Sequence, residues 1–167
     1  MKCEKLSLDT KEKHIEYIVG ELLVNRNLSI AVAESCTGGM VTASLINYPG
    51  ISKVLKEGFV TYTEESKMKR LGVKKDTLQK YTVVSQQVAE EMAEGVAKGS
   101  ETDIGLSSTG IAGPGGGTKE QPVGLVYIGL YYKGKSISKK LNLSGDRQEV
   151  REKATKELLE LLRDTIL

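Results

Sequence analysis

A serine at the end of a short apolar segment is the first candidate for chemistry in this chain. Ser35 follows the apolar run 28–33 and precedes the small polar stretch 37–39, so it lies where a strand would run into a helix. That position suits a nucleophile. The one histidine, His14, is distant in sequence and belongs to an amphipathic N-terminal segment, so a Ser-His-Asp triad is disfavoured. If Ser35 is a nucleophile, we expect a lysine to be its base.

The residues that follow this serine could also bind an anion. Backbone N–H groups in the first turn of a helix lack partners within the helix and lie at the positive end of its dipole. They can therefore hold a phosphate or an oxyanion. The simpler alternative is that Ser35 or Thr37 only caps the helix. The candidate ligand-binding residues here are Cys36, Thr37, Gly38 and Gly39.

A second polar segment, 58–67, supplies a candidate base. Tyr62 lies at the end of an expected strand and Lys67 lies one turn into the helix that follows. Ligands of open α/β folds bind at the carboxyl ends of the strands, so both side chains could reach one site. A partly desolvated lysine has a lowered pKa and can accept a proton. The alternative is an ordinary solvated lysine on a helix surface.

Two further segments could bind a ligand. The stretch 109–122 is rich in glycine and follows an expected strand, but it matches neither the P-loop nor the Gly-x-Gly-x-x-Gly pattern. Its composition suits a backbone that wraps around a ligand, and the alternative is a flexible loop. Near the C-terminus, Asp146 is predicted to cap the start of a helix, because aspartate is a preferred N-cap residue, and Arg147 and Arg151 lie one turn apart. The two arginines could bind a phosphate or carboxylate, or could form surface ion pairs with Glu149.

These segments must be positioned by alternating elements. Helical spacing or helix start signals predict helices over 9–27, 37–47, 64–71, 76–81, 85–99 and from Asp146 onward. Strands are predicted over 28–33, 58–62, 103–108, 123–132 and 136–143, the last two as a hairpin. Alternation followed by an antiparallel pair predicts a mixed sheet between helical layers.

Composition narrows the class of protein. With 167 residues the chain is expected to form one domain over 1–167, with 1–8 as a loose extension. Its net charge of +2 gives no footprint for nucleic acid, and no apolar run is long enough for a membrane span. Two cysteines and one histidine cannot fill a structural zinc site, so reduced thiols in a cytoplasmic protein are expected. No signal peptide is evident.

Together the four polar segments resemble the C-terminal domain of the CinA family, the stand-alone nicotinamide-nucleotide amidases. The resemblance covers the chain from about residue 10 onward, and the combination of motifs is specific. The matching stretches are 33–39, Tyr62 with Lys67, 108–118 with 122–124, and 145–151.

The resemblance implies a three-layer α/β/α fold, a homodimer or larger homo-oligomer, and hydrolysis of nicotinamide mononucleotide to nicotinic acid mononucleotide and ammonia. It implies Ser35 as nucleophile and Lys67 as base, with Tyr62 and Thr109 near the reacting amide. No metal or cofactor is expected. The small-molecule substrate would be bound by Arg147 and the glycine-rich segment, which contains Gly110, Ala112 and Gly113.

Three positions depart from the family pattern: Glu64 replaces the usual asparagine, Gln121 the usual lysine, and Leu125 a common threonine. A carboxylate at Glu64 would raise the pKa of Lys67 and weaken it as a base at neutral pH. Two other functions stay open at this point. One is a weakly active or inactive module that binds a nucleotide or a partner, and the other is a serine amidase for a different small amide.

Overall fold

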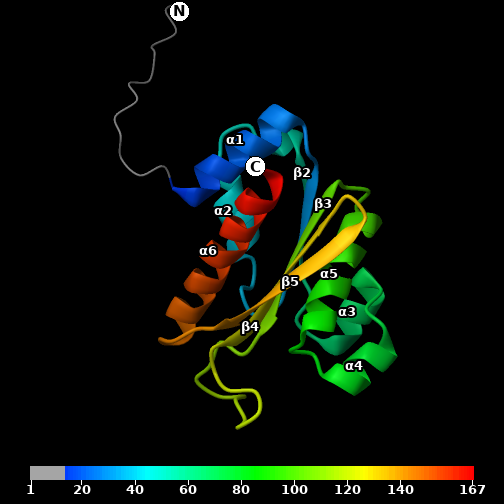
Figure 1. The fold of residues 1–167 in the computed structure, drawn as a ribbon, viewed down its shortest axis with the longest axis vertical. Helices are drawn as coiled ribbons and strands as arrows, with labels where there is room; N and C mark the ends of the chain where they lie inside the picture. Colours follow the sequence, from blue (N-terminus) through cyan, green and yellow to red (C-terminus); the bar gives the residue numbers. More distant parts are fainter. Residues whose placement is uncertain (1–13) are drawn as a thin grey trace, which may run out of the picture.

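The computed structural model describes residues 14–167, which form a five-stranded mixed sheet between two layers of helices (Figure 1). The strands are β1 (Ile30–Glu34), β2 (Leu55–Val60), β3 (Ile104–Gly110), β4 (Leu125–Tyr132) and β5 (Lys135–Asn142). The α-helices of this region are α1 (Ile15–Arg26), α2 (Met40–Ile46), α3 (Glu64–Leu71), α4 (Lys75–Tyr81), α5 (Gln86–Gly99) and α6 (Arg147–Ile166), with a 3-10 turn, η1, at Ile51–Lys53.

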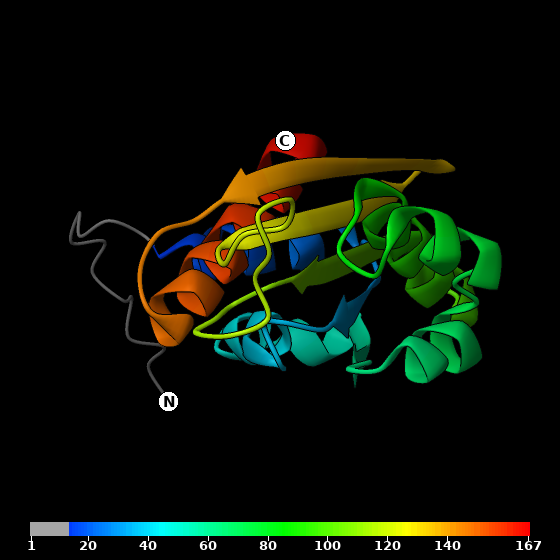
Figure 2. The ribbon, with the colours of Figure 1, turned by 90° about the horizontal axis from the view of Figure 1, so that it is seen from below.

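The order of the strands places four strand ends at one edge of the sheet. The order is β2-β1-β3-β4-β5, with β1 parallel to both β2 and β3, and β4 antiparallel to both β3 and β5. β1, β2, β3 and β5 therefore all run in one direction. The segments that follow them, including the glycine-rich loop (residues 111–124) and the start of α6, meet at the same edge, which Figure 2 shows from below.

Each face of the sheet is covered by its own helices. α1, α2 and α6 lie over one face, and α5 packs on the other with α3 and α4 outside it (Figure 1). The core is aliphatic on both sides: one cluster centres on α6 and the other on the contact between α5 and β1. The predicted three-layer α/β/α architecture is confirmed.

α5 approaches the sheet closely because two strand positions lack side chains. A Cβ at Gly105 would lie 2.0 Å from the carbonyl oxygen of Ala93, and one at Gly129 would lie 2.5 Å from that of Ala89. Ser107 donates a hydrogen bond of 2.6 Å to the same Ala89 carbonyl. The small residues of β3 and β4 thus determine how closely α5 packs against the sheet.

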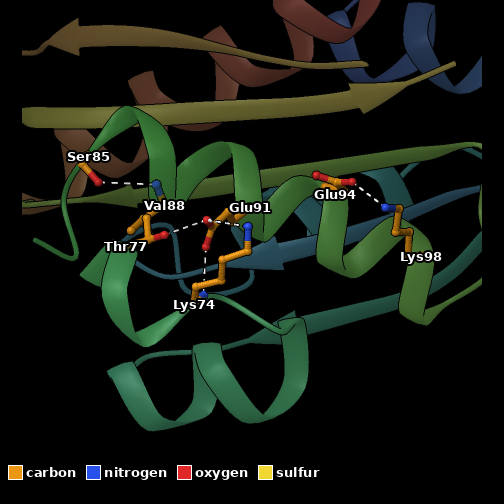
Figure 3. A network of polar contacts seen from close by, with 7 residues as sticks. All are labelled: Lys74, Thr77, Ser85, Val88, Glu91, Glu94 and Lys98. Atoms are coloured by element: carbon orange, nitrogen blue, oxygen red, sulfur yellow. Dashed lines mark hydrogen bonds and ion pairs between the residues drawn. The ribbon is translucent and has the colours of Figure 1, made fainter. Parts of the chain in front are cut away.

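Side-chain contacts join α5 to the preceding helix (Figure 3). The carboxylate of Glu91 accepts hydrogen bonds from the backbone of Lys74 at 2.9 Å and from Thr77 Oγ1 at 2.7 Å. Ser85 caps the start of α5 by accepting from the Val88 N–H, and Lys98 pairs with Glu94 near its end. This layer is therefore held by defined polar contacts as well as by its core.

The elements differ from the expected ones mainly at their ends. β2 begins at Leu55, three residues early, and β3 continues to Gly110. α1 begins at Ile15 with His14 in the capping position, while residues 1–8, Cys3 and the 9–13 part of the expected first helix lie outside the described residues. Within residues 14–167, no helix is both long and apolar enough to cross a membrane.

The largest change is at α2, which starts at Met40 where Thr37 was expected. Gly38 and Gly39 adopt positive φ angles of 60° and 99°, so residues 35–39 form a turn rather than the first turn of a helix. Ser35 therefore sits in a non-helical turn between β1 and α2.

Candidate active site

Ser35 and Lys67 meet in the interior of the protein. Lys67 Nζ lies 3.1 Å from Ser35 Oγ and donates a hydrogen bond of 2.7 Å to the carbonyl of Thr61. Ser35 follows β1, Thr61 follows β2 and Lys67 lies on α3, so the sheet edge brings the three together. The lysine is one turn into α3, whose start is fixed by a capping box between Thr63 and Ser66.

The surroundings of Lys67 favour its neutral form. The residue is 0% exposed, and burial lowers the pKa of its amine from 10.5 to about 8. Negative charge on Cys36 or Glu64 acts in the opposite direction and raises this pKa. The effect of Glu64 has the sign expected from the sequence, but desolvation outweighs it. An amine with a pKa of about 8 has a sizeable neutral fraction near pH 7.5 and can accept a proton from a hydroxyl.

Glu34, the residue before the serine, fixes the turn that carries it. This glutamate is buried, with 1% exposed, and its carboxylate accepts from three backbone N–H groups at the start of α2. Two threonine hydroxyls complete its shell. The five donors are the N–H groups of Gly39, Val41 and Thr42 and the hydroxyls of Thr37 and Thr42.

The glutamate changes the expected role of this helix start. Because Gly39 N–H is bonded to Glu34 and Gly38 N–H to the Ser35 carbonyl, these two amides are not open donors for a ligand. Thr37 is fully buried, and its hydroxyl lies 2.7 Å from that of Ser108. The expectation that Gly38 and Gly39 present free N–H groups is wrong, since a carboxylate of the protein itself occupies the helix start.

Arg151 also has a structural partner. Its guanidinium donates to the carbonyls of Cys36 at 3.1 Å and Thr37 at 2.9 Å, and to the Gln148 side chain. α6 thereby holds the nucleophile turn through two of its backbone carbonyls. Of the two arginines considered as phosphate ligands, Arg147 is the one that reaches the cavity described next.

A cavity of about 270 Å³ opens over Ser35. Its wall combines the ends of β1, β2 and β3 with the glycine-rich loop, the segment after α4 and the start of α6. The lining residues are Ser35, Cys36, Tyr62, Val83, Val84, Thr109, Gly110, Ile111, Ala112, Gly113, Gly115, Gly116 and Arg147. The cavity thus gathers residues from all four polar segments. Lys67 does not line the cavity and lies behind Ser35. The cavity lining also does not include Thr37, Gly38 or Gly39.

Arg147 links the cavity walls. It donates to the carbonyl of Gly113 at 2.7 Å and to the hydroxyl of Tyr62 at 3.1 Å, which joins α6 to the glycine-rich loop and to the end of β2. The Asp146 side chain caps α6, as expected, and so orients the residue beside it. Tyr62 is 61% exposed, so the arginine and the tyrosine border the open side of the cavity.

The second potential nucleophile at this site is the neighbouring thiol. Cys36 lines the cavity, but burial raises the pKa of its thiol to about 11. A thiol of that pKa is protonated at neutral pH and is a poor nucleophile. His14 lines a separate groove between α1, α2 and α6 and not the cavity over Ser35. Among the described residues, Ser35 with Lys67 is the arrangement suited to nucleophilic attack.

The comparisons with known proteins agree with the fold and the motifs. A model of the CinA C-terminal domain family matches residues 12–166. The chain belongs to the CinA C-terminal domain family.

Relatives of this CinA domain are found among longer proteins. A Clostridioides difficile protein named "Putative competence-damage inducible protein" is 60% identical over 158 residues, which are 95% of this chain and 38% of that protein. A Clostridium novyi protein of the same name is 58% identical over 93% of the chain and 38% of its own length. The chain thus spans about two fifths of the length of these relatives.

Solved structures of the family share the fold. The competence/damage inducible protein CihA from Agrobacterium tumefaciens has a TM-score of 0.86 and 34% identity, covering 95% of this chain and 99% of its own. A CinA superfamily protein from Escherichia coli has a TM-score of 0.86 and 32% identity, covering 97% and 95%.

Several residues of this CinA domain's site were given no function from the sequence. Glu34 stood inside the recognised motif without a role, because its sequence does not reveal that a buried carboxylate would cap α2. Val83 and Val84 lie in a connection with no polar motif, yet they line the cavity. Gln121 donates to Thr82 Oγ1 and to the Val84 carbonyl. In the sequence, the one feature that drew attention to Gln121 is that it replaces the lysine usual in the family.

Proposed function

We propose that this CinA domain is an amidohydrolase that converts nicotinamide mononucleotide to nicotinic acid mononucleotide and ammonia through an ester on Ser35. The observation that carries the proposal is the contact of 3.1 Å between Lys67 Nζ and Ser35 Oγ, made by a lysine with no exposed surface. The substrate is inferred from the family resemblance of the four polar segments.

The first half of the reaction forms the ester. Neutral Lys67 accepts the proton of Ser35 Oγ, which attacks the carboxamide carbon. The hydrogen bond from Lys67 to the Thr61 carbonyl uses one N–H of the amine and directs the lone pair toward the serine. When the tetrahedral intermediate collapses, the C–N bond breaks and the lysine ammonium gives its proton to the leaving nitrogen, so ammonia departs and Lys67 is neutral again.

The second half consumes a water molecule. The water attacks the ester carbon while Lys67 accepts one of its protons, the bond from carbon to Ser35 Oγ breaks, and the proton returns to the serine. The acid product then leaves. The same lysine serves both halves, and its pKa of about 8 lets it hold and release a proton near neutral pH.

The oxyanion needs donors that the protein has not already used. Since Glu34 occupies the N–H groups of Gly39, Val41 and Thr42, the start of α2 is not the source. We assign this role to donors from the Thr109–Gly113 segment, which lines the cavity beside Ser35, other than the Ile111 N–H, which already donates to the Leu125 carbonyl at 2.9 Å. The Thr109 hydroxyl itself donates to the Val83 carbonyl at 2.8 Å, so the backbone of this segment is the better candidate than that side chain.

The ribose phosphate is assigned to Arg147. This guanidinium lines the open side of the cavity and could exchange its bond to the Tyr62 hydroxyl for one to a phosphate oxygen. Tyr62 would then lie beside the nucleotide. A homodimer or larger homo-oligomer stays a prediction of the family resemblance, and sedimentation of the purified protein tests it.

Release of ammonia from nicotinamide mononucleotide by the purified protein tests the function. Stoichiometric ammonia and nicotinic acid mononucleotide support it. A protein that binds the nucleotide without turnover is a binding module, and one that hydrolyses only other carboxamides is a different amidase.

A further inference from the structure

The segment of residues 82–84, here called the strap, joins α4 to α5 and forms part of the wall over Ser35. Both of its valines line the cavity, and Val84 is 6% exposed. The remaining wall is largely glycine-rich backbone and polar side chains. Together with Ile111 and Ala112, the strap therefore provides the apolar surface of a site that is otherwise polar or made of main chain.

The backbone of the strap is held in an unusual conformation. Thr82 has φ 64° and ψ 167°, a combination that a β-branched residue rarely adopts. Such a residue keeps this conformation only where its surroundings hold it in place, and backbone of this kind gathers at ligand-binding sites. The contacts of the strap therefore decide the position of its two valines.

Three side chains supply those contacts. Ser85 Oγ donates to the Thr82 carbonyl at 3.0 Å, and Thr109 Oγ1 donates to the Val83 carbonyl at 2.8 Å. Gln121 makes two bonds: its Nε2 donates to Thr82 Oγ1 at 2.8 Å and to the Val84 carbonyl at 2.9 Å. A carboxamide nitrogen carries two hydrogens, so both are used on the strap.

Gln121 is itself anchored in the glycine-rich loop. Its backbone N–H donates to Thr118 Oγ1 at 3.0 Å, and its carbonyl accepts from the Thr118 N–H at 2.8 Å. Its side chain crosses from this closed turn to the strap. Two walls of the cavity, the glycine-rich loop and the valines, are therefore tied together by one side chain.

We propose that Gln121 is a specificity-determining residue of the Ser35 site, because its clamp on the strap fixes the apolar wall that selects a flat aromatic carboxamide. The proposal rests on the amidase function proposed above. A wall in a fixed position can pack against the face of a planar ring, and it leaves too little space for a ring that is not planar. When the clamp is removed, the wall moves away, so ground-state binding weakens and discrimination against a non-planar ring falls, whereas the Ser35–Lys67 contact is untouched.

Gln121→Met tests the clamp with a neutral side chain of similar length that has no donor. Gln121→Lys restores donors at the same place and is the rescue variant. Gln79→Met is the matched control, because Gln79 lies exposed on α4. The substrates are nicotinamide mononucleotide and its analogue with a saturated, non-planar piperidine-3-carboxamide ring, compared by kcat, KM and the ratio of kcat/KM for the two.

For Gln121→Met we expect KM for the natural nucleotide to rise about five- to tenfold, the size of one or two lost hydrogen bonds, with kcat within about twofold. The preference over the saturated-ring analogue should fall by a similar factor. Gln121→Lys and Gln79→Met should behave like the parent protein. An unchanged KM and preference in Gln121→Met, or a loss confined to kcat, would overturn the proposal.

Hydrogen exchange separates this test from the proposed function. Peptides covering residues 82–86 should exchange faster in Gln121→Met than in Gln79→Met, while the rest of the sheet stays protected. If the parent protein releases no ammonia, the amidase function fails and exchange still reports on the clamp. Equal exchange in the two variants would show that Gln121 does not hold the strap.

Discussion

Lys67 Nζ lies 3.1 Å from Ser35 Oγ although the two residues are 32 positions apart and come from different layers of the fold. The serine belongs to the turn after β1, and the lysine to α3, a helix on the α5 side of the sheet. Burial of the lysine makes the pair chemically useful, since a fully solvated amine would be almost entirely protonated at neutral pH.

Activity should rise with pH through a midpoint near 8. Only neutral Lys67 can accept the serine proton, and the pKa of its amine is about 8. The pH dependence of kcat/KM for nicotinamide mononucleotide, measured from pH 6 to 9.5, reports this value in the free enzyme. A rate that is flat or falls over pH 7 to 9 would remove Lys67 as the base.

Glu64→Gln provides the internal check on that profile. Glu64 raises the pKa of Lys67, so its removal should move the midpoint to lower pH and increase the rate at pH 7. Glu65→Gln, an exposed neighbour in the same helical turn, is the control and should leave the midpoint unchanged. A midpoint that moves equally in both variants would indicate a general charge effect.

Lys67→Met should abolish turnover and stabilise the fold. The folded-state pKa of about 8 lies below the usual 10.5, so between these values the unfolded chain binds more protons and stability rises with pH. Below pH 8 the buried amine is protonated in the folded state, and its desolvation then lowers the free energy of unfolding by the full amount. Methionine removes that penalty, so we expect a gain of about 1–3 kcal/mol at pH 7 that shrinks toward pH 10.5.

Urea unfolding at pH 7 and pH 10 measures the effect of Lys67→Met on stability. Lys67→Arg is the companion variant, and it should also be inactive because a guanidinium keeps its proton. Substantial activity in the arginine variant would mean that Lys67 supplies positive charge and does not act as a base.

Glu34→Ala should be strongly destabilising. The buried carboxylate accepts five hydrogen bonds, and its removal leaves three backbone N–H groups at the start of α2 without their acceptor. A buried donor that is left without an acceptor costs about 1–3 kcal/mol, and this change leaves several. Glu57→Ala, an exposed change on β2, controls for loss of a carboxylate. Equal midpoints of thermal unfolding in the two variants would contradict the role given to Glu34.

Arg147→Ala should affect the phosphorylated substrate selectively. A charge-assisted hydrogen bond contributes on the order of 1.5–3 kcal/mol, so kcat/KM for nicotinamide mononucleotide should fall by roughly ten- to a hundredfold. Hydrolysis of nicotinamide riboside, which lacks the phosphate and should be the poorer substrate, should barely change. Equal losses on both substrates would show that Arg147 supports the cavity wall through Gly113 and Tyr62.

The sequence was most informative where local rules and long-range placement coincide. The Asp146 cap, the helix carrying Lys67 and the hairpin all follow from short-range signals, and the observed elements agree with them within a few residues. The strand order also brings all four polar segments to one sheet edge, as open α/β folds require.

The missed features depend on side-chain direction and not on spacing. Glu34 at the end of a strand does not reveal from sequence that its carboxylate turns back to cap the next helix. Arg151 resembled a second phosphate ligand until its contacts with two carbonyls of the nucleophile turn were known. Likewise, nothing local in residues 82–84 indicates a cavity wall, because the wall exists only when Thr109 and Gln121 hold it.

The central claim is that Ser35 is the nucleophile of an amide hydrolysis, and one comparison tests it most directly. Purified parent protein and Ser35→Ala are incubated with nicotinamide mononucleotide, and ammonia is measured while circular dichroism verifies that both are folded. We predict that the parent releases ammonia and that the variant loses several orders of magnitude in rate. Turnover by a folded Ser35→Ala protein at a rate close to that of the parent would contradict the serine-ester mechanism.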